Sequence, residues 1–210
     1  MGWTGRVEIR DWKGSDPGSW RVAVLLPGAG YTVRMPLLHW TATALVEAGW
    51  RVRTAHWSRE ETTPDPQGLA ERAAAQGFED TAPWAVRLLV AKSMGTLAAS
   101  WAAREGVAGA WLTPLMTRSE VLAPLLAARQ PALLVGGTAD PLWQRPPSIP
   151  VGCRIVEIPD ADHGLQVEGR WQASMDAHRQ AVDAVVAFGE QVAQADAAAG
   201  SDRPRGAAEG

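Results

Sequence analysis

The chain has 210 residues, of which 46% are apolar and 20% are charged, as in an ordinary soluble globular protein. The formal net charge of −3 argues against a nucleic-acid partner, because such domains carry clustered basic residues. A single cysteine, Cys153, rules out an intrachain disulfide and favours a reducing, cytoplasmic location. No apolar run approaches the roughly 20 residues that cross a bilayer, and the first residues lack the apolar core of a signal peptide, so we expect no membrane partner.

Apolar runs and helical patterns alternate along most of the chain. Segments of strand character are Val7–Arg10, Trp20–Leu26, Arg51–His56, Ala85–Ala91, Ala108–Leu112, Ala132–Gly136 and Arg154–Ile158. Helical patterns cover Met35–Ala48, Pro66–Gln76, Gly95–Glu105, Ser119–Ala128 and Asp176–Gln194. Several strand segments are continuously apolar, which is expected when helices cover both faces of a sheet. The alternation predicts an α/β fold with a mostly parallel sheet, flanked by helices on both faces.

The pattern indicates one domain over residues 1–194. The first strand segment is followed by the turn-forming stretch GSDPGS, and we expect it to add an antiparallel strand at the edge of the sheet. From residue 195 the sequence is rich in Ala and Gly without an apolar period, which predicts a disordered tail over residues 195–210. The sequence carries no signal for an oligomeric state.

Reactive residue types follow several of the strand segments. Ser93 comes after VRLLVAK, Asp140 after ALLVGGTA, and His163 after RIVEIPDAD. The carboxyl ends of parallel strands meet at one edge of a sheet, so these side chains are expected to converge there. A serine hydroxyl becomes a nucleophile when a histidine takes its proton and an acid orients that histidine. Ser93, His163 and Asp140 are therefore our candidate catalytic residues.

The same edge offers candidates for the remaining parts of such a site. The helix after Ser93 directs its first amides toward an anion, which makes the N–H of Met94 one candidate oxyanion donor. The second donor is expected from the small residues of PGAGY, where Ala29 is the first choice and Gly30 the reserve. Gly30, Tyr31 and Trp143 are the residues we expect to contact substrate.

These motifs resemble the alpha/beta-hydrolase superfamily. The stretch AKSMG around Ser93 is similar to its G-x-S-x-G corner, GGTADP to its acid strand, PDADHG to its histidine loop and LLPGAG to its oxyanion loop. The resemblance is greatest to the small, lidless, dienelactone-hydrolase-like branch, here with a serine in place of that branch's cysteine. It implies a serine hydrolase of the carboxylesterase or thioesterase kind that acts on a small acyl substrate without a cofactor. Two departures are Ala91 for the first glycine, and Pro27 where histidine is frequent.

Alternative interpretations exist for these residues. Ser93 has the sequence position of a helix N-cap. Asp160 and Asp162 compete with Asp140 for the acid role, and together with His163 they could suggest a metal site, although no matching ligands occur elsewhere. The unusual Pro27 motivates a second function, a binding or assembly protein that has the hydrolase fold but little catalysis.

Tryptophan is unusually frequent, with 11 residues against 2 Phe and 1 Tyr. Trp20, Trp50, Trp84 and Trp111 lie in or beside apolar runs and are expected in the core. Trp57, Trp143 and Trp171 follow strand ends or site loops and are candidates for lining a pocket. Between the strand segments at 108–112 and 132–136 there is room for one helix only, so we expect no cap domain over the site.

Overall fold

The computed structural model describes residues 7–58, 64–146, 148 and 151–201. One seven-stranded sheet runs through it in the order β1-β3-β2-β4-β5-β6-β7. The strands are β1 (Glu8–Asp11), β2 (Arg21–Leu26), β3 (Arg51–His56), β4 (Val86–Lys92), β5 (Ala108–Leu112), β6 (Ala132–Gly137) and β7 (Cys153–Ile158). All neighbouring pairs are parallel except β1 with β3, so the carboxyl ends of β2 to β7 lie at one edge.

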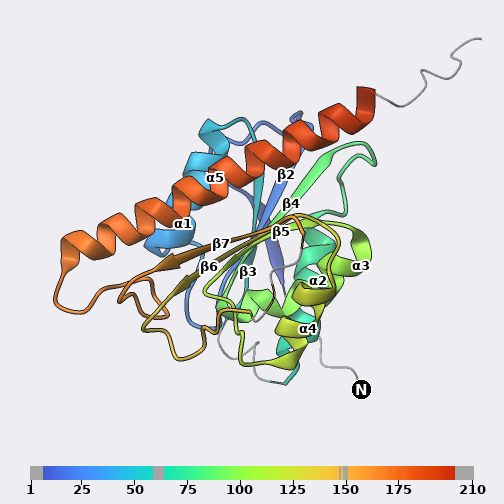
Figure 1. Ribbon diagram of the computed structural model, residues 1–210. Helices are drawn as coiled ribbons and strands as arrows, with labels where there is room; N and C mark the ends of the chain where they lie inside the picture. The colour runs from blue at the N-terminus through green and yellow to red at the C-terminus, as the bar shows by residue number, and fades with distance from the viewer. Residues whose placement is uncertain (1–6, 59–63, 147, 149–150, 202–210) are drawn as a thin grey trace, which may run out of the picture.

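Helices cover both faces of the sheet (Figure 1). On one face, α1 (Pro36–Glu47) packs beside the long α5 (Trp171–Ser201). On the other face lie α2 (Pro66–Gly77), α3 (Ala99–Glu105) and α4 (Ser119–Ala127), together with the short 3-10 helix η2 (Ser93–Ala98). The predicted α/β class, with a mostly parallel sheet between two helical layers, is therefore confirmed.

The central strand β4 shows why its sequence is apolar without alternation. Leu88 and Val90 belong to the core under α1 and α5, whereas Leu89 and Ala91 belong to the core under α2, α3 and α4. All four side chains are fully buried. Because successive side chains of a strand point to opposite faces, a strand covered on both sides must be apolar at every position. This packing fixes the direction in which β4 delivers the residues that follow it.

The first strand forms the expected antiparallel edge, but with a different partner from its neighbour in sequence. β1 pairs with β3, with Glu8 opposite His56 and Asp11 opposite Arg53. The connection between β1 and β2 therefore crosses the end of β3 instead of forming a hairpin, since β3 occupies the position next to β2.

The C-terminal helix is longer than the sequence pattern predicted. It begins at Trp171, before the expected start at Asp176, and continues to Ser201. Residues 195–201 are thus helical, so the predicted disordered tail is wrong for this part. Alanine, which dominates the stretch, has the highest helix propensity and sustains a helix that has already been nucleated by packing. The rest of the predicted tail, 202–210, lies outside the described residues.

Two of the four tryptophans that were expected in the core are instead exposed. Trp50 and Trp111 are buried, at 1% and 2% exposure, whereas Trp20 is 38% and Trp84 is 65% exposed. Trp20 precedes β2 and its ring lies under the Arg21 guanidinium, 4.9 Å from the ring centroid. The apolar neighbours in the sequence belong to the strands, so they gave no information about a residue just outside them.

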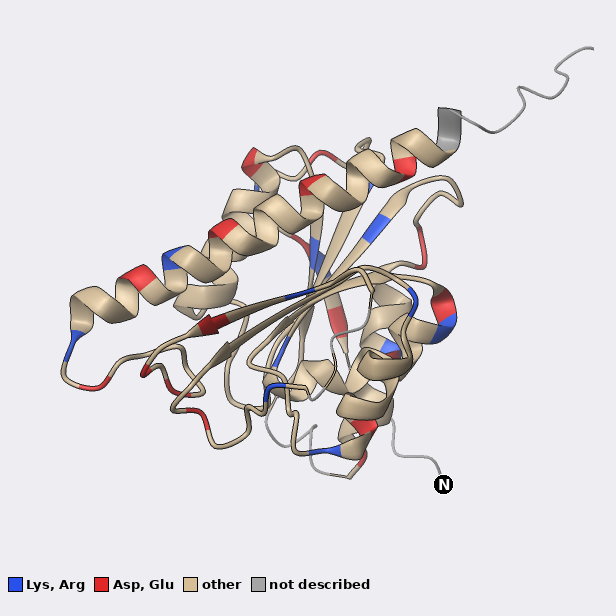
Figure 2. Ribbon diagram, in the orientation of Figure 1, with Lys and Arg blue, Asp and Glu red and all other residues tan. Residues whose placement is uncertain are grey.

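The outer side of α5 carries charges of both signs, among them Asp176, Arg179 and Asp183 (Figure 2).

Within the described part of the chain, no helix has the length and apolar character needed to span a bilayer.

Candidate active site

Ser93 stands at a sharp corner between β4 and η2. Its φ of 52° lies in the left-handed region, which is unfavourable for a residue with a Cβ and is frequent at functional sites. Gly95 permits the corner because a Cβ there would lie 2.8 Å from the backbone oxygen of Leu26. Ala91, the departure from the G-x-S-x-G pattern, is fully buried in the core under α2, α3 and α4. The alanine is thus compatible with the corner.

Three side chains from three strand ends form a continuous hydrogen-bonded chain. Ser93 Oγ lies 2.8 Å from His163 Nε2, and His163 Nδ1 lies 2.7 Å from Asp140 Oδ2. The residues come from the ends of β4, β6 and β7, as expected from the parallel sheet. The Ser93 hydroxyl therefore faces a base, and η2 begins at Ser93 itself, so the side chain is not an N-cap.

The acid of this chain is shielded from water. The Asp140 side chain is fully buried, whereas 31% of the His163 side chain is exposed. The second carboxylate oxygen of Asp140 accepts a hydrogen bond of 2.9 Å from the N–H of Leu142. Both oxygens are thus occupied, and the carboxylate is held in one orientation toward the imidazole.

The two rival carboxylates have other partners. Asp162 Oδ1 accepts hydrogen bonds from the N–H groups of Gly164 and Gln166, at 2.7 and 2.9 Å, and so shapes the loop that carries His163. Asp160 forms an ion pair with Arg170 on the surface. The described residues contain no group of three or more His, Cys, Asp or Glu side chains suited to holding a metal ion.

The loop after β7 is also supported from α5. His178, which is only 8% exposed, places Nε2 at 2.9 Å from the carbonyl oxygen of Gly164. Leu165, at φ 56°, is fully buried in the core under α1 and α5. Nothing in the sequence around His178 indicates this contact, because it links residues from separate elements.

Lys92, the residue before Ser93, is a buried cation that sequence reasoning did not assign to the site. The residue is 2% exposed, and Nζ donates hydrogen bonds to the carbonyl oxygen of His163 at 3.1 Å and to Thr113 Oγ1 at 3.2 Å. The ammonium also lies 4.5 Å from the centroid of the Tyr31 ring, a cation–π distance. Burial lowers the pKa of Lys92 to about 8, against the opposing influence of Asp140 and Asp162.

The loop after β2 passes directly beside Ser93. A Cβ on Gly28 would lie 3.4 Å from Ser93 Cβ and 3.7 Å from Ser93 Oγ, so the backbone passes within van der Waals contact of the serine. Trp57 Nε1 donates a hydrogen bond of 3.1 Å to the Gly28 carbonyl oxygen, and Gly28 N–H donates to the Tyr31 carbonyl oxygen at 3.0 Å. These bonds hold the loop in which Pro27 replaces the more frequent histidine. Trp57 thus supports the loop by a hydrogen bond.

Two backbone N–H groups are available near the serine. Ala29 is exposed in the loop after β2, and its N–H has no hydrogen-bond partner in the described part of the chain. Met94 follows Ser93 in the first turn of η2, where backbone N–H groups have no partner within the helix. Gly30 is exposed beside Ala29, with nothing within 4 Å of an added Cβ.

Tyr31 has an internal role in addition to any contact with a ligand. Its hydroxyl accepts a hydrogen bond of 2.9 Å from the N–H of Leu37 at the start of α1, and its ring faces Lys92. Burial raises the pKa of Tyr31, so the phenol stays neutral. The residue connects the loop after β2, α1 and the buried ammonium.

Trp143 does not line the site as expected. It is 8% exposed, and its ring covers Gly136 so closely that a Cβ at that position would collide with the indole. The indole N–H donates a hydrogen bond of 2.9 Å to Glu157 Oε1 on β7. Trp143 is thus packed over Gly136 in the core under α2, α3 and α4.

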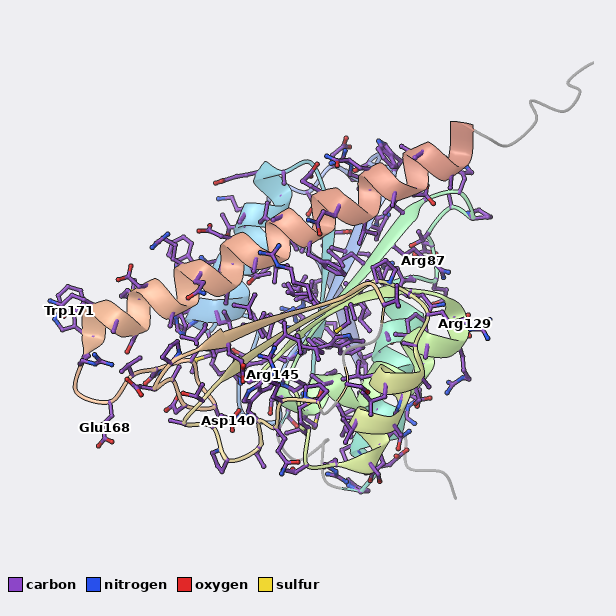
Figure 3. All side chains as sticks on the ribbon, in the orientation of Figure 1. Arg87, Arg129, Asp140, Arg145, Glu168 and Trp171 are labelled. Atoms are coloured by element: carbon purple, nitrogen blue, oxygen red, sulfur yellow. The ribbon has the colours of Figure 1, made fainter. Side chains whose placement is uncertain are left out.

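A groove next to the site lies between the loop after β7 and the start of α5, with a cavity volume of about 840 Å³. Gln166 and Val167 line it on one side, and Trp171 and Met175 line it on the other. Trp171 is the first residue of α5, where its side chain projects outward and is 70% exposed (Figure 3). Of the tryptophans expected to line a pocket, Trp171 therefore does so.

No family model and no curated protein matches the sequence. Among solved structures, Est1E from Butyrivibrio proteoclasticus aligns with a TM-score of 0.66 at 13% identity, over 90% of this chain and 94% of that one. A serine hydrolase without a lid from Xanthomonas campestris aligns with a TM-score of 0.59 at 19% identity, over 90% and 88% of the two chains.

An alpha/beta serine hydrolase homologue from Coxiella burnetii aligns with a TM-score of 0.57 at 17% identity, covering 87% of this chain and 93% of that one. A further structure of Est1E contains bound ferulic acid and aligns with a TM-score of 0.55 at 13% identity, over 85% and 94% of the two chains. In the present chain, α4 is the one helix between β5 and β6, so this segment contains no cap domain. The chain has the alpha/beta-hydrolase fold in its lidless form.

Proposed function

We propose that the protein is a serine hydrolase that cleaves a carboxylic ester or thioester of a small substrate through an acyl-enzyme intermediate. The observation that carries this proposal is the chain of hydrogen bonds from Ser93 through His163 to Asp140, at 2.8 and 2.7 Å. Such a chain activates a hydroxyl that is otherwise a weak nucleophile.

In the acylation step, Ser93 Oγ attacks the carbonyl carbon of the substrate while His163 Nε2 takes the hydroxyl proton. The imidazolium is stabilised by Asp140, and the carbonyl oxygen, now an anion, accepts hydrogen bonds from the N–H groups of Met94 and Ala29. Each such donor contributes about 3 kcal/mol to the transition state. The C–O or C–S bond to the leaving group then breaks, and His163 returns the proton to the departing oxygen or sulfur atom.

In the deacylation step, His163 takes a proton from a water molecule, whose oxygen attacks the acyl carbon. The bond between this carbon and Ser93 Oγ breaks, the proton returns to the serine, and the carboxylic acid is released. The water that this step consumes can reach the site because 31% of the His163 side chain is exposed.

A small substrate suits a site without a cap. An open site makes few contacts with distant parts of a substrate, so long acyl chains add little binding energy. The presence of ferulic acid in Est1E, which shares the fold, supports a small-molecule ligand. We also propose a cytoplasmic location, with which the single cysteine, Cys153, is compatible.

The test combines a covalent probe with kinetics. A fluorophosphonate should form a stable adduct on Ser93, located by mass spectrometry, and the protein should hydrolyse p-nitrophenyl acetate and butyrate faster than longer esters. Ser93→Ala should abolish both signals, whereas Ser100→Ala, which removes another partly buried serine hydroxyl, should retain labelling at Ser93.

Other outcomes would contradict the proposed hydrolysis. Equal activity in Ser93→Ala would show that the serine is not the nucleophile. A folded protein that no probe labels would favour the binding or assembly function. Acyl transfer uses the same residues, and added alcohol or amine would reveal it by a new ester or amide among the products.

A further inference from the structure

A second pocket, which we name the edge pocket, lies on the α1 side of the sheet between β1, β3 and the loop before α1. It has a cavity volume of about 470 Å³. Nitrogen-bearing side chains of three chain segments line it, namely Arg10, Lys13, Arg34, His39 and His56. This concentration of basic groups stands out in a protein of net charge −3.

The register of β1 on β3 decides which side chains face this pocket. Glu8 lies opposite His56 and Arg10 opposite Thr54, and residues paired in this way project to the same face of a sheet. The alternate pairs, Ile9 with Ala55 and Asp11 with Arg53, project to the opposite face. The basic side chain of Arg10 and the imidazole of His56 are thus brought together on the α1 side.

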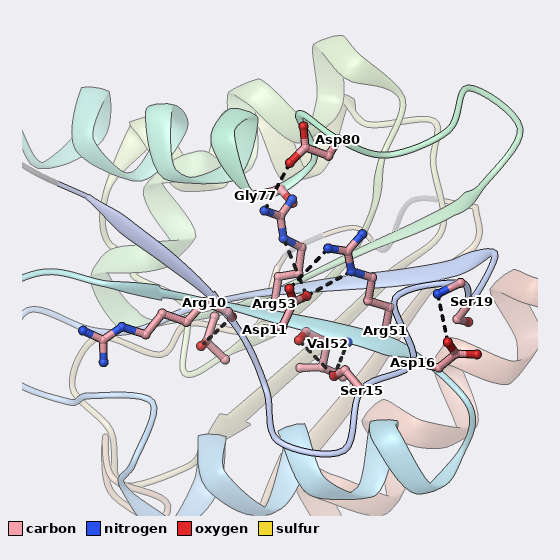
Figure 4. Close-up of polar contacts among 12 residues, drawn as sticks. Arg10, Asp11, Ser15, Asp16, Ser19, Arg51, Val52, Arg53, Gly77 and Asp80 are labelled. Atoms are coloured by element: carbon pink, nitrogen blue, oxygen red, sulfur yellow. Dashed lines mark hydrogen bonds and ion pairs between the residues drawn. The ribbon is translucent and has the colours of Figure 1, made fainter.

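Asp11, the one acidic residue among the described residues that line the pocket, is already neutralised. Its carboxylate accepts hydrogen bonds of 2.9 and 3.3 Å from Arg51, and Arg53 Nε lies 4.0 Å away (Figure 4). Arg53 is itself anchored by a bond of 2.7 Å to the Gly77 carbonyl oxygen, beneath α2. The negative charge of Asp11 is therefore directed away from the pocket and balanced there.

Two cations at the pocket, Lys13 and Arg34, have no acidic partner among the described residues. Arg10 is paired with Glu8 at 2.5 Å, whereas Lys13 and Arg34 form no ion pair or hydrogen bond with any residue that the structure describes. Both are exposed and free to reach over the cavity. Burial lowers the pKa of His56, and the charges of Arg10 and Arg34 lower it further, against the opposing influence of Glu8.

The pocket also has an aromatic wall. Trp12 is half-buried, and its ring meets His39 edge-on with 5.3 Å between the ring centroids. A ligand with an apolar or aromatic body can therefore rest against the indole while an anionic group meets the cations.

We propose that the edge pocket binds a small organic anion, whose carboxylate or phosphate group pairs with Arg34 and Lys13 and whose apolar part contacts Trp12. The site is distinct from Ser93, since β2 separates the ends of β3 and β4. With about 4.8 Å between adjacent strands, the ends of β3 and β4 are about 10 Å apart. The anion thus belongs either to the far end of a substrate held at Ser93 or to a separate ligand.

Nuclear magnetic resonance titration of the ¹⁵N-labelled protein with benzoate tests the site, and benzamide serves as the neutral isostere. Benzoate should produce saturable shifts centred on Trp12, Arg34 and His56, and should bind about tenfold more tightly than benzamide, as expected for charge-assisted pairing. Arg34→Gln and Lys13→Gln should each weaken benzoate binding about fivefold, since each removes one such pair.

The matched control is Arg129→Gln, because Arg129 is an exposed arginine that follows α4 on the other side of the sheet (Figure 3). It removes the same charge and should leave benzoate binding unchanged. Equal affinity for benzoate and benzamide would overturn the proposal. So would shifts that avoid the pocket, or a loss in Arg129→Gln as large as in Arg34→Gln.

A kinetic comparison separates the two sources of the anion. If the anion belongs to the substrate, Arg34→Gln should raise KM for mono-p-nitrophenyl glutarate relative to KM for p-nitrophenyl butyrate. If the anion is a separate ligand, this ratio should stay constant while benzoate binding falls. The titration does not require turnover, so failure of the proposed hydrolase activity leaves the test of the pocket intact.

Discussion

Replacement of Lys92 by methionine removes a buried charge but keeps most of the side-chain volume. The pKa of Lys92 falls from 10.5 to about 8, and burial is the largest cause. At about 1.4 kcal/mol per pKa unit, the ammonium destabilises the folded state by about 3 kcal/mol relative to the neutral amine. Its hydrogen bonds to His163 and Thr113 keep it in place without removing this effect.

The sign of the pH dependence follows from proton binding. Below pH 8 the lysine is charged in both the folded and the unfolded state, so the destabilisation is fully present. Between pH 8 and 10.5 the unfolded chain binds the proton and the folded protein does not, so stability rises with pH. The free energy of unfolding of the wild type, minus that of Lys92→Met, should increase by about 2 kcal/mol from about pH 7 to about pH 9.5.

Urea denaturation at the two pH values measures this difference. Subtraction of the variant removes most of the contribution from groups that titrate in both proteins, such as Cys153. Lys13→Met is the control, because Lys13 is the other lysine of the chain and is exposed. A difference that is constant or that decreases with pH would show that Lys92 is not held as a destabilised buried cation.

Three further changes test the site and its support. If the proposed mechanism holds, Asp140→Asn should lower kcat for p-nitrophenyl butyrate by roughly three to four orders of magnitude, with an unchanged circular dichroism spectrum. Gly137→Ala places a Cβ into the Ala161 carbonyl and should lower the free energy of unfolding by about 2–4 kcal/mol, whereas Gly30→Ala, which has open space, should leave urea denaturation nearly unchanged. Trp57→Phe removes the indole N–H that holds the loop after β2. On the proposed mechanism it should reduce kcat about tenfold with little change in KM, because the oxyanion donor that it displaces acts in the transition state. An unchanged kcat would show that another contact positions the loop.

The sheet and the convergence of the site could be predicted because both depend on local pattern and on parallel topology. Apolar runs and the alternation of strand and helix patterns located β2 to β7 to within a residue or two. A parallel sheet gathers the residues after its strands, so the proximity of Ser93, Asp140 and His163 followed from their sequence positions alone.

The features that escaped prediction depend on contacts between distant elements. Nothing near Trp143 in the sequence indicates that its ring covers Gly136, and nothing near Lys92 indicates that its ammonium reaches the loop after β7. The partner of β1 could not be predicted either. β2 already pairs with β4 on one side and with β3 on the other, so β1 pairs with β3, and this arrangement is not visible in the sequence near β1.

The contact between His178 and the Gly164 carbonyl oxygen couples the last helix to the reactive edge. Opening of the first turns of α5 would release that carbonyl and loosen the imidazole beside it. Amide protons in the loop should therefore exchange with deuterium at rates that follow those of the first turns of α5. If the proposed mechanism holds, a fusion that unfolds this end of the helix should also lower the rate of ester hydrolysis.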